Sequence, residues 1–394
     1  MCYNQGNNAP FGETMRDQRL DKWAEVLATY SLDVKKNQTV FLLCDLNALP
    51  LLEAVYENLI LNGAKVEVLV LHKGLNEFLL KNGSDEQISF TPVARLAGVQ
   101  TYDHYLFLGA VSNSKMLSKI PPKKQSLASV GNKPILDAIL GRFEKGQLRW
   151  CVTMYPTPAA AQDAEMGNID FENFILNAGF LCDESPVKSW KALEKQQKSL
   201  IRFLENKKEL RFQNRDGTDL RVNVENMIWV NCCGRINFPD GEVFTGPNLK
   251  SSDGGVNGVV RYSLPTVYRN VEIHDIELIF EKGAVKHAKA SKNEDFLLEM
   301  ISQDPGAKFV GEIAIGTNYR IDTCVKDILY DEKIGGTFHL ALGKGYPETG
   351  NRNESALHWD MIFDMRKGGS IHADGQLVSE NGKFVHPDWP QGYN

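Results

Sequence analysis

The chain has 394 residues, of which 42% are hydrophobic and 24% charged, and its formal net charge is -6 at pH 7. At about 100–200 residues per domain this length predicts two domains, and the composition is ordinary for a globular protein with a sizeable core. The mild acidity argues against nucleic-acid binding, which usually depends on a basic patch. Because the sequence contains no run of about 18 apolar residues, we also expect no membrane span.

The seven cysteines form no CxxC pair, and their odd number without framework spacing indicates reduced thiols and a cytoplasmic location. Cys232 and Cys233 are adjacent and could form a metal or redox pair, although burial in a strand is the favoured interpretation. The first 14 residues are polar and rich in Gly and Asn, without the charged and apolar regions of a signal peptide. We expect them to be a disordered extension or a tag.

Residues 15–205 are predicted to form an α/β domain with a mostly parallel sheet. Short continuous apolar runs, as strands buried on both faces require, occur at 39–45, 64–71, 104–110 and 148–155. Apolar periodicity predicts helices at 18–31, 50–63, 135–143 and 186–208. Strand–helix–strand order favours right-handed crossovers between parallel strands. The domain has no GxGxxG and no GxxxxGK[ST], and the stretch 155–165 could line a cleft or simply connect a strand to a helix.

Residues 206–394 are predicted to form a β-rich, mixed α+β domain that holds the chemistry. The stretch 210–224 has two alternating runs around Asp216-Gly217, which is a hairpin signal. Residues 271–285 alternate with a period of two, and Lys282-Gly283 can turn. Further strands are predicted at 310–315, 337–343 and 357–365.

Carboxylates and histidines in this second half stand at informative positions. Glu242 follows a Pro-Asp-Gly turn, and Glu312 lies in an otherwise apolar strand, where a carboxylate is costly to bury unless it is paired or binds a metal. His339 lies in another apolar strand. His358 and Asp360 are two residues apart and would share one face of a strand.

Taken one at a time these positions have ordinary explanations: a turn carboxylate, a satisfied core histidine, a solvated strand face. His372-Ala373-Asp374 has the same His-x-Asp spacing as His358 and Asp360. It leads directly into Gly375, so we interpret it as a hairpin turn. As a set with Glu332, three glutamates, two histidines and an aspartate are a mixed oxygen and nitrogen group that zinc and hard divalent ions accept. The number exceeds one tetrahedral site and suits two ions that share a carboxylate, which is hydrolytic chemistry.

Together these stretches resemble the aminopeptidase T family of thermostable metallo-exopeptidases, over nearly the whole chain from Met15. The segments that match in order and approximate spacing are RDQRLDKWAEVL, YPTPAAAQ, FPDGEVFTGP, GEIA, DEKIGGTFHLALGKGYP and LHWD. The stretch between Tyr346 and His358 is shorter than in the family, a departure that concerns pocket shape and substrate preference.

The resemblance implies a metal-dependent aminopeptidase that hydrolyses the N-terminal residue of peptides through a water activated by two metal ions. It implies metal ligands at Glu242, Glu312, His339, His358 and Asp360, with Glu332 at or next to the metals. Glu312 would bridge the ions or act as the base, and Tyr346 matches the catalytic tyrosine. The family is similar in its use of two divalent ions (zinc, cobalt or magnesium), in acting on peptides with a free N-terminus, and in forming homodimers.

Two other interpretations remain open. A related branch of the same architecture resembles ring-cleaving dihydroxypyridine dioxygenases, in which one iron is held by two histidines and an aspartate. Here His339, His358 and Asp360 would suffice, but Glu242 and Glu312 favour the peptidase because a single-iron site does not need them. A non-catalytic binding protein would instead require carboxylates that face solvent and do not cluster.

Overall fold

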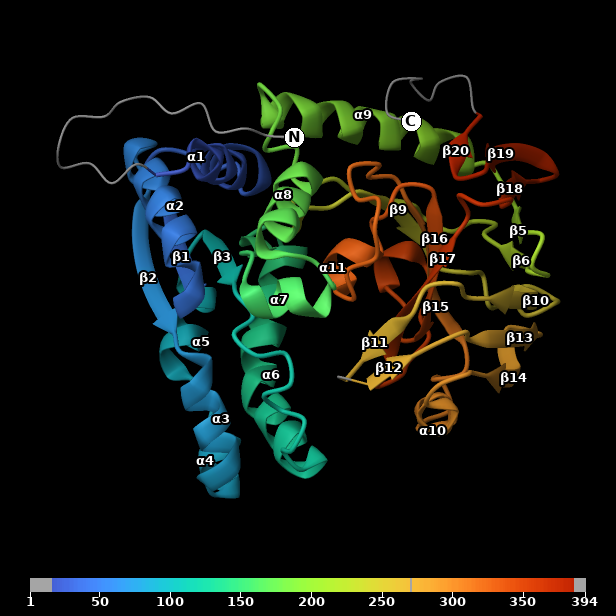
Figure 1. Cartoon of the computed structure of the whole chain (residues 1–394), viewed down its shortest axis with the longest axis horizontal. Helices are drawn as coiled ribbons and strands as arrows, with labels where there is room; N and C mark the ends of the chain where they lie inside the picture. Colours follow the sequence, from blue (N-terminus) through green and yellow to red (C-terminus); the bar gives the residue numbers. More distant parts are fainter. Residues whose placement is uncertain (1–15, 270, 386–394) are drawn as a thin grey trace. The chain divides into compact units, whose positions relative to one another are not determined.

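The computed structural model describes residues 16–269 and 271–385, which form two compact units (Figure 1). The first contains residues 16–187 and the return segment 234–239, and the second contains residues 188–233 and 240–385. The predicted order, a parallel α/β sheet followed by a β-rich region, is confirmed. The domain boundary at 205/206 stays a prediction, and the extension predicted for residues 1–14 lies outside the described residues. In the described part of the chain, no helix has the length and apolar character to cross a membrane.

The sheet of the first unit is wholly parallel, with strand order β2-β1-β3-β4-β8. Its strands are β1 (Thr39–Asp45), β2 (Lys65–Leu71), β3 (His104–Gly109), β4 (Arg149–Met154) and β8 (Asn237–Phe238). The first four confirm the strands that were predicted from continuous apolar runs. Side chains on both faces of β1 are buried, which explains why its sequence is apolar without alternation.

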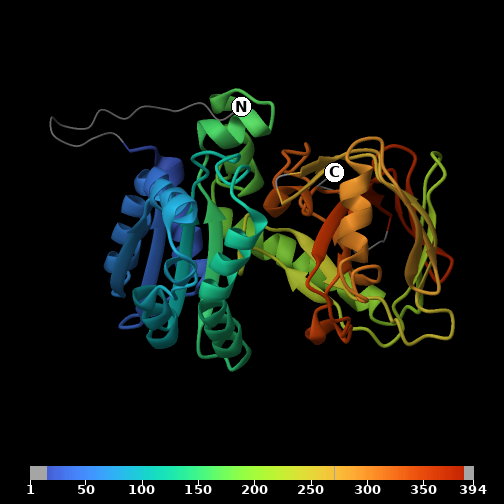
Figure 2. The same cartoon turned by 90° about the horizontal axis from the view of Figure 1, so that it is seen from below.

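Helices cover both faces of this sheet (Figure 2), as expected when the right-handed crossover from β1 to β2 runs in one direction along the sheet and those from β2 to β3 and from β3 to β4 run in the other. On one face Phe41, Leu43 and Tyr105 pack with residues of α5 and α6. The helical segments of the unit are α1 (Gln18–Glu25), the π-helical turn Val26–Ser31, the 3₁₀ turn Leu46–Ala48, α2 (Leu49–Leu61), α3 (Lys73–Asn82), α4 (Asp85–Ile88), α5 (Val93–Thr101), α6 (Pro122–Glu144), α7 (Pro158–Asp163) and α8 (Asn168–Ala178).

The predicted helices at 18–31 and 50–63 are confirmed, but the helix predicted at 135–143 begins much earlier, at Pro122. Its first half carries too few buried apolar side chains to show a period. In the stretch 155–165, α7 begins after Thr157, whose hydroxyl accepts a hydrogen bond from the amide of Ala160 at 3.2 Å. That stretch therefore contains a capped helical turn.

The cysteines of the described chain are mostly reduced, as predicted. Free thiols are found at Cys44, Cys151, Cys232, Cys233 and Cys324. Cys182 is disulfide-bonded, so the prediction of reduced thiols is wrong for this residue.

The second unit contains two larger antiparallel sheets and a two-stranded ribbon of β11 (Thr266–Tyr268) and β12 (Val271–Ile273). The eight-stranded sheet has the order β14 (Ala284–Lys289), β13 (Glu277–Glu281), β10 (Val256–Arg261), β6 (Asp219–Asn223), β5 (Glu209–Gln213), β18 (Ser370–Ala373), β19 (Gln376–Glu380) and β20 (Lys383–Phe384). The five-stranded sheet has the order β17 (His358–Asp364), β16 (Thr337–Gly343), β15 (Val310–Gly316), β9 (Glu242–Thr245) and β7 (Val230–Cys232). The helical segments are α9 (Pro186–Leu204), α10 (Glu294–Ser302), α11 (Ile328–Asp331) and the 3₁₀ turn Pro347–Thr349.

Most predicted strands and turns of this unit are confirmed. The hairpin around Asp216-Gly217 joins β5 to β6, and Lys282-Gly283 turns β13 into β14. The alternating stretch 271–285 is not one strand, because the backbone breaks at Asp275, which has a φ of 49°. His372 and Ala373 end β18 before a turn at Asp374-Gly375 into β19, as predicted.

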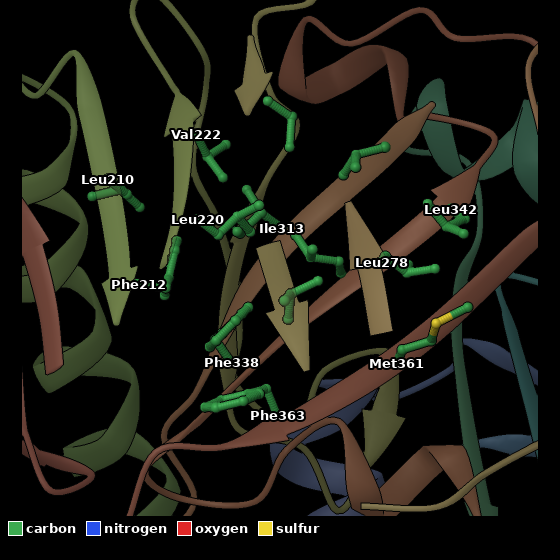
Figure 3. Packing of buried hydrophobic residues seen from close by; sticks show 14 of the residues in the cluster. Leu210, Phe212, Leu220, Val222, Leu278, Ile313, Phe338, Leu342, Met361 and Phe363 are labelled. Carbon is green, nitrogen blue, oxygen red and sulfur yellow. The ribbon is translucent and has the colours of Figure 1, made fainter. Parts of the chain in front are cut away.

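The two larger sheets pack face to face over one apolar core (Figure 3). Phe212 of β5 meets Phe338 of β16 with ring centroids 4.2 Å apart, and Phe363 of β17 lies 5.1 Å from Phe338. Alternate residues of β15, β16 and β17 enter this core, so the residues between them point to the other face of the five-stranded sheet.

In the first unit, His104 opens β3 as a buried imidazole with Nε2 3.0 Å from Gln38 Oε1. Burial lowers the pKa of His104 from 6.5 to about 4, because the charged imidazolium loses its hydration. The folded chain therefore keeps this group neutral at pH values where the unfolded chain protonates it.

We predict that His104 makes the first unit sensitive to acid. The contribution of His104 to the free energy of unfolding is fully present above pH 6.5. It falls as the pH decreases toward about 4, because only the unfolded state binds the proton in that window. The variant His104→Leu should reduce the slope of unfolding free energy against pH by up to about 1.4 kcal/mol per pH unit. Urea denaturation between pH 4 and 7 measures the slope, and an unchanged slope would contradict the prediction.

Candidate metal centre

Four neighbouring strands present the predicted ligands on the face of the five-stranded sheet that points away from the core. Glu242 comes from β9, Glu312 from β15, His339 from β16, and His358 and Asp360 from β17. Each stands next to a residue that enters the apolar core. The alternation of the strands therefore separates the polar set from the core.

Strand register brings the side chains of this set together. Ala341 of β16 pairs with Glu312 of β15 on one side and with Asp360 of β17 on the other. His339 is two residues away from Ala341 on the same face of β16. Because Ala341 has only a methyl group, the two flanking carboxylates have space to turn toward the imidazole.

The first convergence point is the imidazole of His339, which is fully buried (0% exposed). Its Nε2 lies 3.3 Å from Glu242 Oε2, 3.7 Å from Glu312 Oε1 and 4.0 Å from Asp360 Oδ1. Glu332 also belongs here, because ligand atoms of Glu242, Glu332 and His339 all lie within 4.8 Å of one another.

The second convergence point is His358, at the start of β17. Its Nε2 lies 3.4 Å from Glu312 Oε2 and 3.5 Å from Asp360 Oδ2. Its Nδ1 lies 2.9 Å from the carbonyl oxygen of Lys344, which can only accept a hydrogen bond. This contact places the proton on Nδ1 and leaves Nε2 available as a ligand. Glu312 and Asp360 therefore each direct one oxygen to each histidine.

Several of these buried atoms lack a hydrogen-bond partner among the described residues: Glu242 Oε2, His339 Nε2 and Asp360 Oδ1. Leaving buried polar atoms unpaired is costly, so a group of them that face one another favours a bound partner. Oxygen and imidazole nitrogen atoms in this proportion are ligands for zinc and similar divalent ions. The residues present thus fit a metal centre.

The charges of the set perturb one another strongly. Burial raises the pKa of Glu242 and of Asp360. For Glu312 burial acts in the same direction, but its contacts with His339 and His358 outweigh it and lower the pKa. Burial would lower the pKa of both histidines, yet the surrounding carboxylates raise it to about 9 for His339 and about 10 for His358. Divalent ions that bind through these imidazoles would therefore compete with protons.

Tyr346 lies beside the second convergence point and is partly exposed (37%). Its hydroxyl is 3.5 Å from His358 Nε2, and its ring packs against Phe244, with centroids 5.3 Å apart. Burial of the phenol and the charges of Glu312 and Asp360 raise its pKa well above the usual range. The hydroxyl consequently keeps its proton and can donate it to a hydrogen bond.

The sequence analysis missed two charged residues of the centre, Lys333 and Asp240. Lys333 Nζ lies 2.9 Å from Glu242 Oε1, contacts Glu332 Oε1, and is 3.9 Å from Asp240 Oδ1. Burial would lower the pKa of Lys333, but the three carboxylates raise it well above its usual value. The available signals were the position of Lys333 next to Glu332 and the presence of both Lys333 and Asp240 in segments that match the family.

The backbone before Glu242 is held by a close approach that only glycine permits. Gly241 has a φ of 130°, and a Cβ there would lie 2.5 Å from Cβ of Asn318. Asn318 is fully buried; its side-chain amide donates to the carbonyl of Asp240 at 2.8 Å, and its backbone amide donates to the carbonyl of Lys333 at 3.1 Å. Asn318 thereby ties the start of β9 to the segment that carries Glu332.

A sequence profile of the family described as thermophilic metalloprotease (M29) matches residues 16–384. The chain belongs to this M29 metalloprotease family. The predicted resemblance to aminopeptidase T and the prediction of a metallopeptidase are thereby confirmed. The M29 chain is 26% identical to aminopeptidase T of Thermus thermophilus, over 92% of its own length and 93% of the relative's. It is 24% identical to aminopeptidase 2 of Geobacillus stearothermophilus, over 93% and 95% of the two chains.

Solved structures show the same fold. Wild-type AmpT from Thermus thermophilus superposes with a TM-score of 0.80 at 24% identity, covering 94% of the M29 chain and 99% of that chain. A 2,5-dihydroxypyridine dioxygenase from Pseudomonas putida superposes with a TM-score of 0.60 at 15% identity, covering 96% and 100%. These likenesses concern the fold, which different chemistries can share.

We predict that Ala341→Val weakens metal binding without unfolding the M29 chain. A branched side chain between Glu312 and Asp360 would displace the carboxylates from His339. Metal affinity should fall by about 10- to 100-fold, the range seen when ligand orientation is disturbed. Isothermal titration with Zn²⁺ measures it. The matched control Ala288→Val, on β14 of the other sheet, should keep the wild-type affinity; if Ala341→Val keeps it too, the space beside Ala341 is not required.

Proposed function

We propose that this M29 chain is an aminopeptidase that hydrolyses the N-terminal residue of peptides through a water activated by two divalent ions. One observation carries the proposal: Glu312 and Asp360 each direct one oxygen toward His339 and the other toward His358. Two carboxylates shared between two imidazoles suit a pair of ions that share ligands, whereas a single ion would leave one end of each carboxylate unused.

The residues divide naturally between the two ions. The first would be held by His339 and Glu242, with Glu332 at its side, and the second by His358. Glu312 and Asp360 would contribute to both. Such ions, zinc, cobalt or magnesium, would supply an activated water and polarise the carbonyl of the peptide bond.

Two side chains of the protein would supply the base and the hydrogen-bond donor that the reaction needs. Glu312 lies between the two histidines, where it can bridge the ions or accept the proton of the attacking water. Tyr346 keeps its proton and lies at the partly exposed side of the site, so its hydroxyl can donate a hydrogen bond where negative charge develops on the carbonyl oxygen. The free α-amine of the peptide would bind at one ion or at a neighbouring carboxylate.

A dioxygenase has the same fold, but its single iron would leave two buried glutamates of this site without a metal to bind. An iron held by His339, His358 and Asp360 would not need the buried Glu242 and Glu312, which face the same histidines. A non-catalytic role requires carboxylates that face solvent, whereas Glu242 and Glu312 are buried. The site therefore favours the peptidase. The homodimer and the cytoplasmic location stay predictions.

We predict that activity depends on two ions per chain. Treatment with EDTA should abolish hydrolysis of Leu-p-nitroanilide, and added Co²⁺ or Zn²⁺ should restore it, because no buried residue of the set replaces the water activation that the ions supply. Metal analysis of the active protein should give two ions per chain. Activity in metal-free protein would refute the proposal, and one iron per chain with ring cleavage of a dihydroxypyridine would establish the alternative.

We predict that Tyr346→Phe lowers kcat and leaves KM nearly unchanged. The hydroxyl would act on charge that appears in the transition state, and loss of such a donor typically costs about 10²- to 10³-fold in kcat. Steady-state kinetics on Leu-p-nitroanilide measures both constants. Tyr268→Phe is the control, since Tyr268 stacks on Trp359 on the core side of the sheet. Full kcat in Tyr346→Phe would remove Tyr346 from the mechanism.

A further inference from the structure

A lysine is buried inside the metal centre. Lys333 is 0% exposed, and within residues 16–269 and 271–385 it is the one lysine that is buried. Its ammonium contacts Glu242 and Glu332 and lies 3.9 Å from Asp240 Oδ1. A buried ammonium is costly unless it is paired, and here three carboxylates surround it. The contacts make Lys333 an integral cation of the centre.

The backbone that carries this ammonium is itself held by hydrogen bonds. The amide of Lys333 donates to the carbonyl of Tyr330 at 3.0 Å, and its carbonyl accepts from Asn318 at 3.1 Å. Asn318 also holds the carbonyl of Asp240. Asn318 consequently ties the backbone of Lys333 to the backbone of Asp240.

The two carboxylate oxygens of Glu242 contact different groups, one Lys333 and the other His339. Oε1 accepts from Nζ at 2.9 Å, while Oε2 lies 3.3 Å from His339 Nε2 and has no hydrogen-bond partner within the part of the chain that the structure describes. Holding one oxygen orients the other toward the imidazole. Lys333 is thus a positioning residue for Glu242, since it acts on the candidate metal ligand.

The charges of the centre balance only if Lys333 is counted. The centre as a whole contains five carboxylates: Asp240, Glu242, Glu312, Glu332 and Asp360. Two divalent ions, the number in the proposed function on which this step rests, supply four positive charges. The ammonium supplies the fifth, and with neutral histidines the set is neutral before water is deprotonated.

The same place offers ligands for another metal ion. Ligand atoms of Cys232, Asp240 and Glu242 lie within 4.8 Å of one another, and the latter two are partners of Lys333. We propose that Lys333 is a resident monovalent cation that occupies a third cation position and limits the centre to two divalent ions. A thiolate with two carboxylates is a suitable set for Co²⁺ or Zn²⁺ once the ammonium is removed.

The test is to count ions after the ammonium is deleted. Wild-type protein and Lys333→Ala are dialysed against Co²⁺, the metal content per chain is measured, and absorption spectra are recorded. Lys333→Ala should bind a third equivalent and show a near-ultraviolet thiolate-to-Co²⁺ band, which Lys333→Ala/Cys232→Ser should lose. Two or fewer ions with the wild-type spectrum would overturn the proposal. A wild-type count other than two would instead contradict the proposed function.

A charge-balanced variant keeps the test decisive if Lys333→Ala does not fold. Lys333→Ala/Asp240→Asn removes one positive and one negative charge, so it should fold and bind two Co²⁺ without the thiolate band. If this double variant also fails to fold, or binds a third ion, the charge-balance argument is wrong. Lys198→Ala, which removes an exposed ion pair with Glu194, is the control and should match the wild type in ion count and spectrum.

Discussion

Burial of negative charge on one face of a sheet is the constraint on which the second unit depends. Glu242 and Glu312 are buried beside Asp360, and carboxylates so close together repel one another and lose hydration. Such a group is stable only with cations in it. In the described chain, the groups that face these carboxylates are the imidazoles of His339 and His358 and the ammonium of Lys333.

The five-stranded sheet satisfies this constraint because one of its faces is apolar and the other carries the charged side chains. Phe338 and Met361 enter the core between the sheets, and their neighbours His339 and Asp360 face away from it. The core therefore fixes strand register, and register fixes which ligands meet, since a slip of one residue would exchange the faces. Ala341 shows the precision needed, because its small side chain lies between two carboxylates.

The fold alone does not decide the chemistry. A dioxygenase and an aminopeptidase superpose on this chain over nearly its full length. What distinguishes the possibilities is the number of buried carboxylates and their sharing between His339 and His358. Glu242 and Lys333 then extend the centre beyond what a single ion requires. Function is decided by these side chains, within a frame that several chemistries can occupy.

The sequence by itself determined the elements that follow from a local pattern of apolar, polar and turn residues. These are the apolar strand 39–45, the hairpin at Asp216-Gly217 and the ligand strands of the second unit. It also identified the candidate ligands, through a resemblance that covers most of the chain. Only the tertiary structure decided that Lys333 is internal, because a lysine beside Glu332 has the local pattern of a solvated turn. Its burial depends on Asn318 and Asp240, residues distant in sequence whose hydrogen bonds exist only in the folded chain.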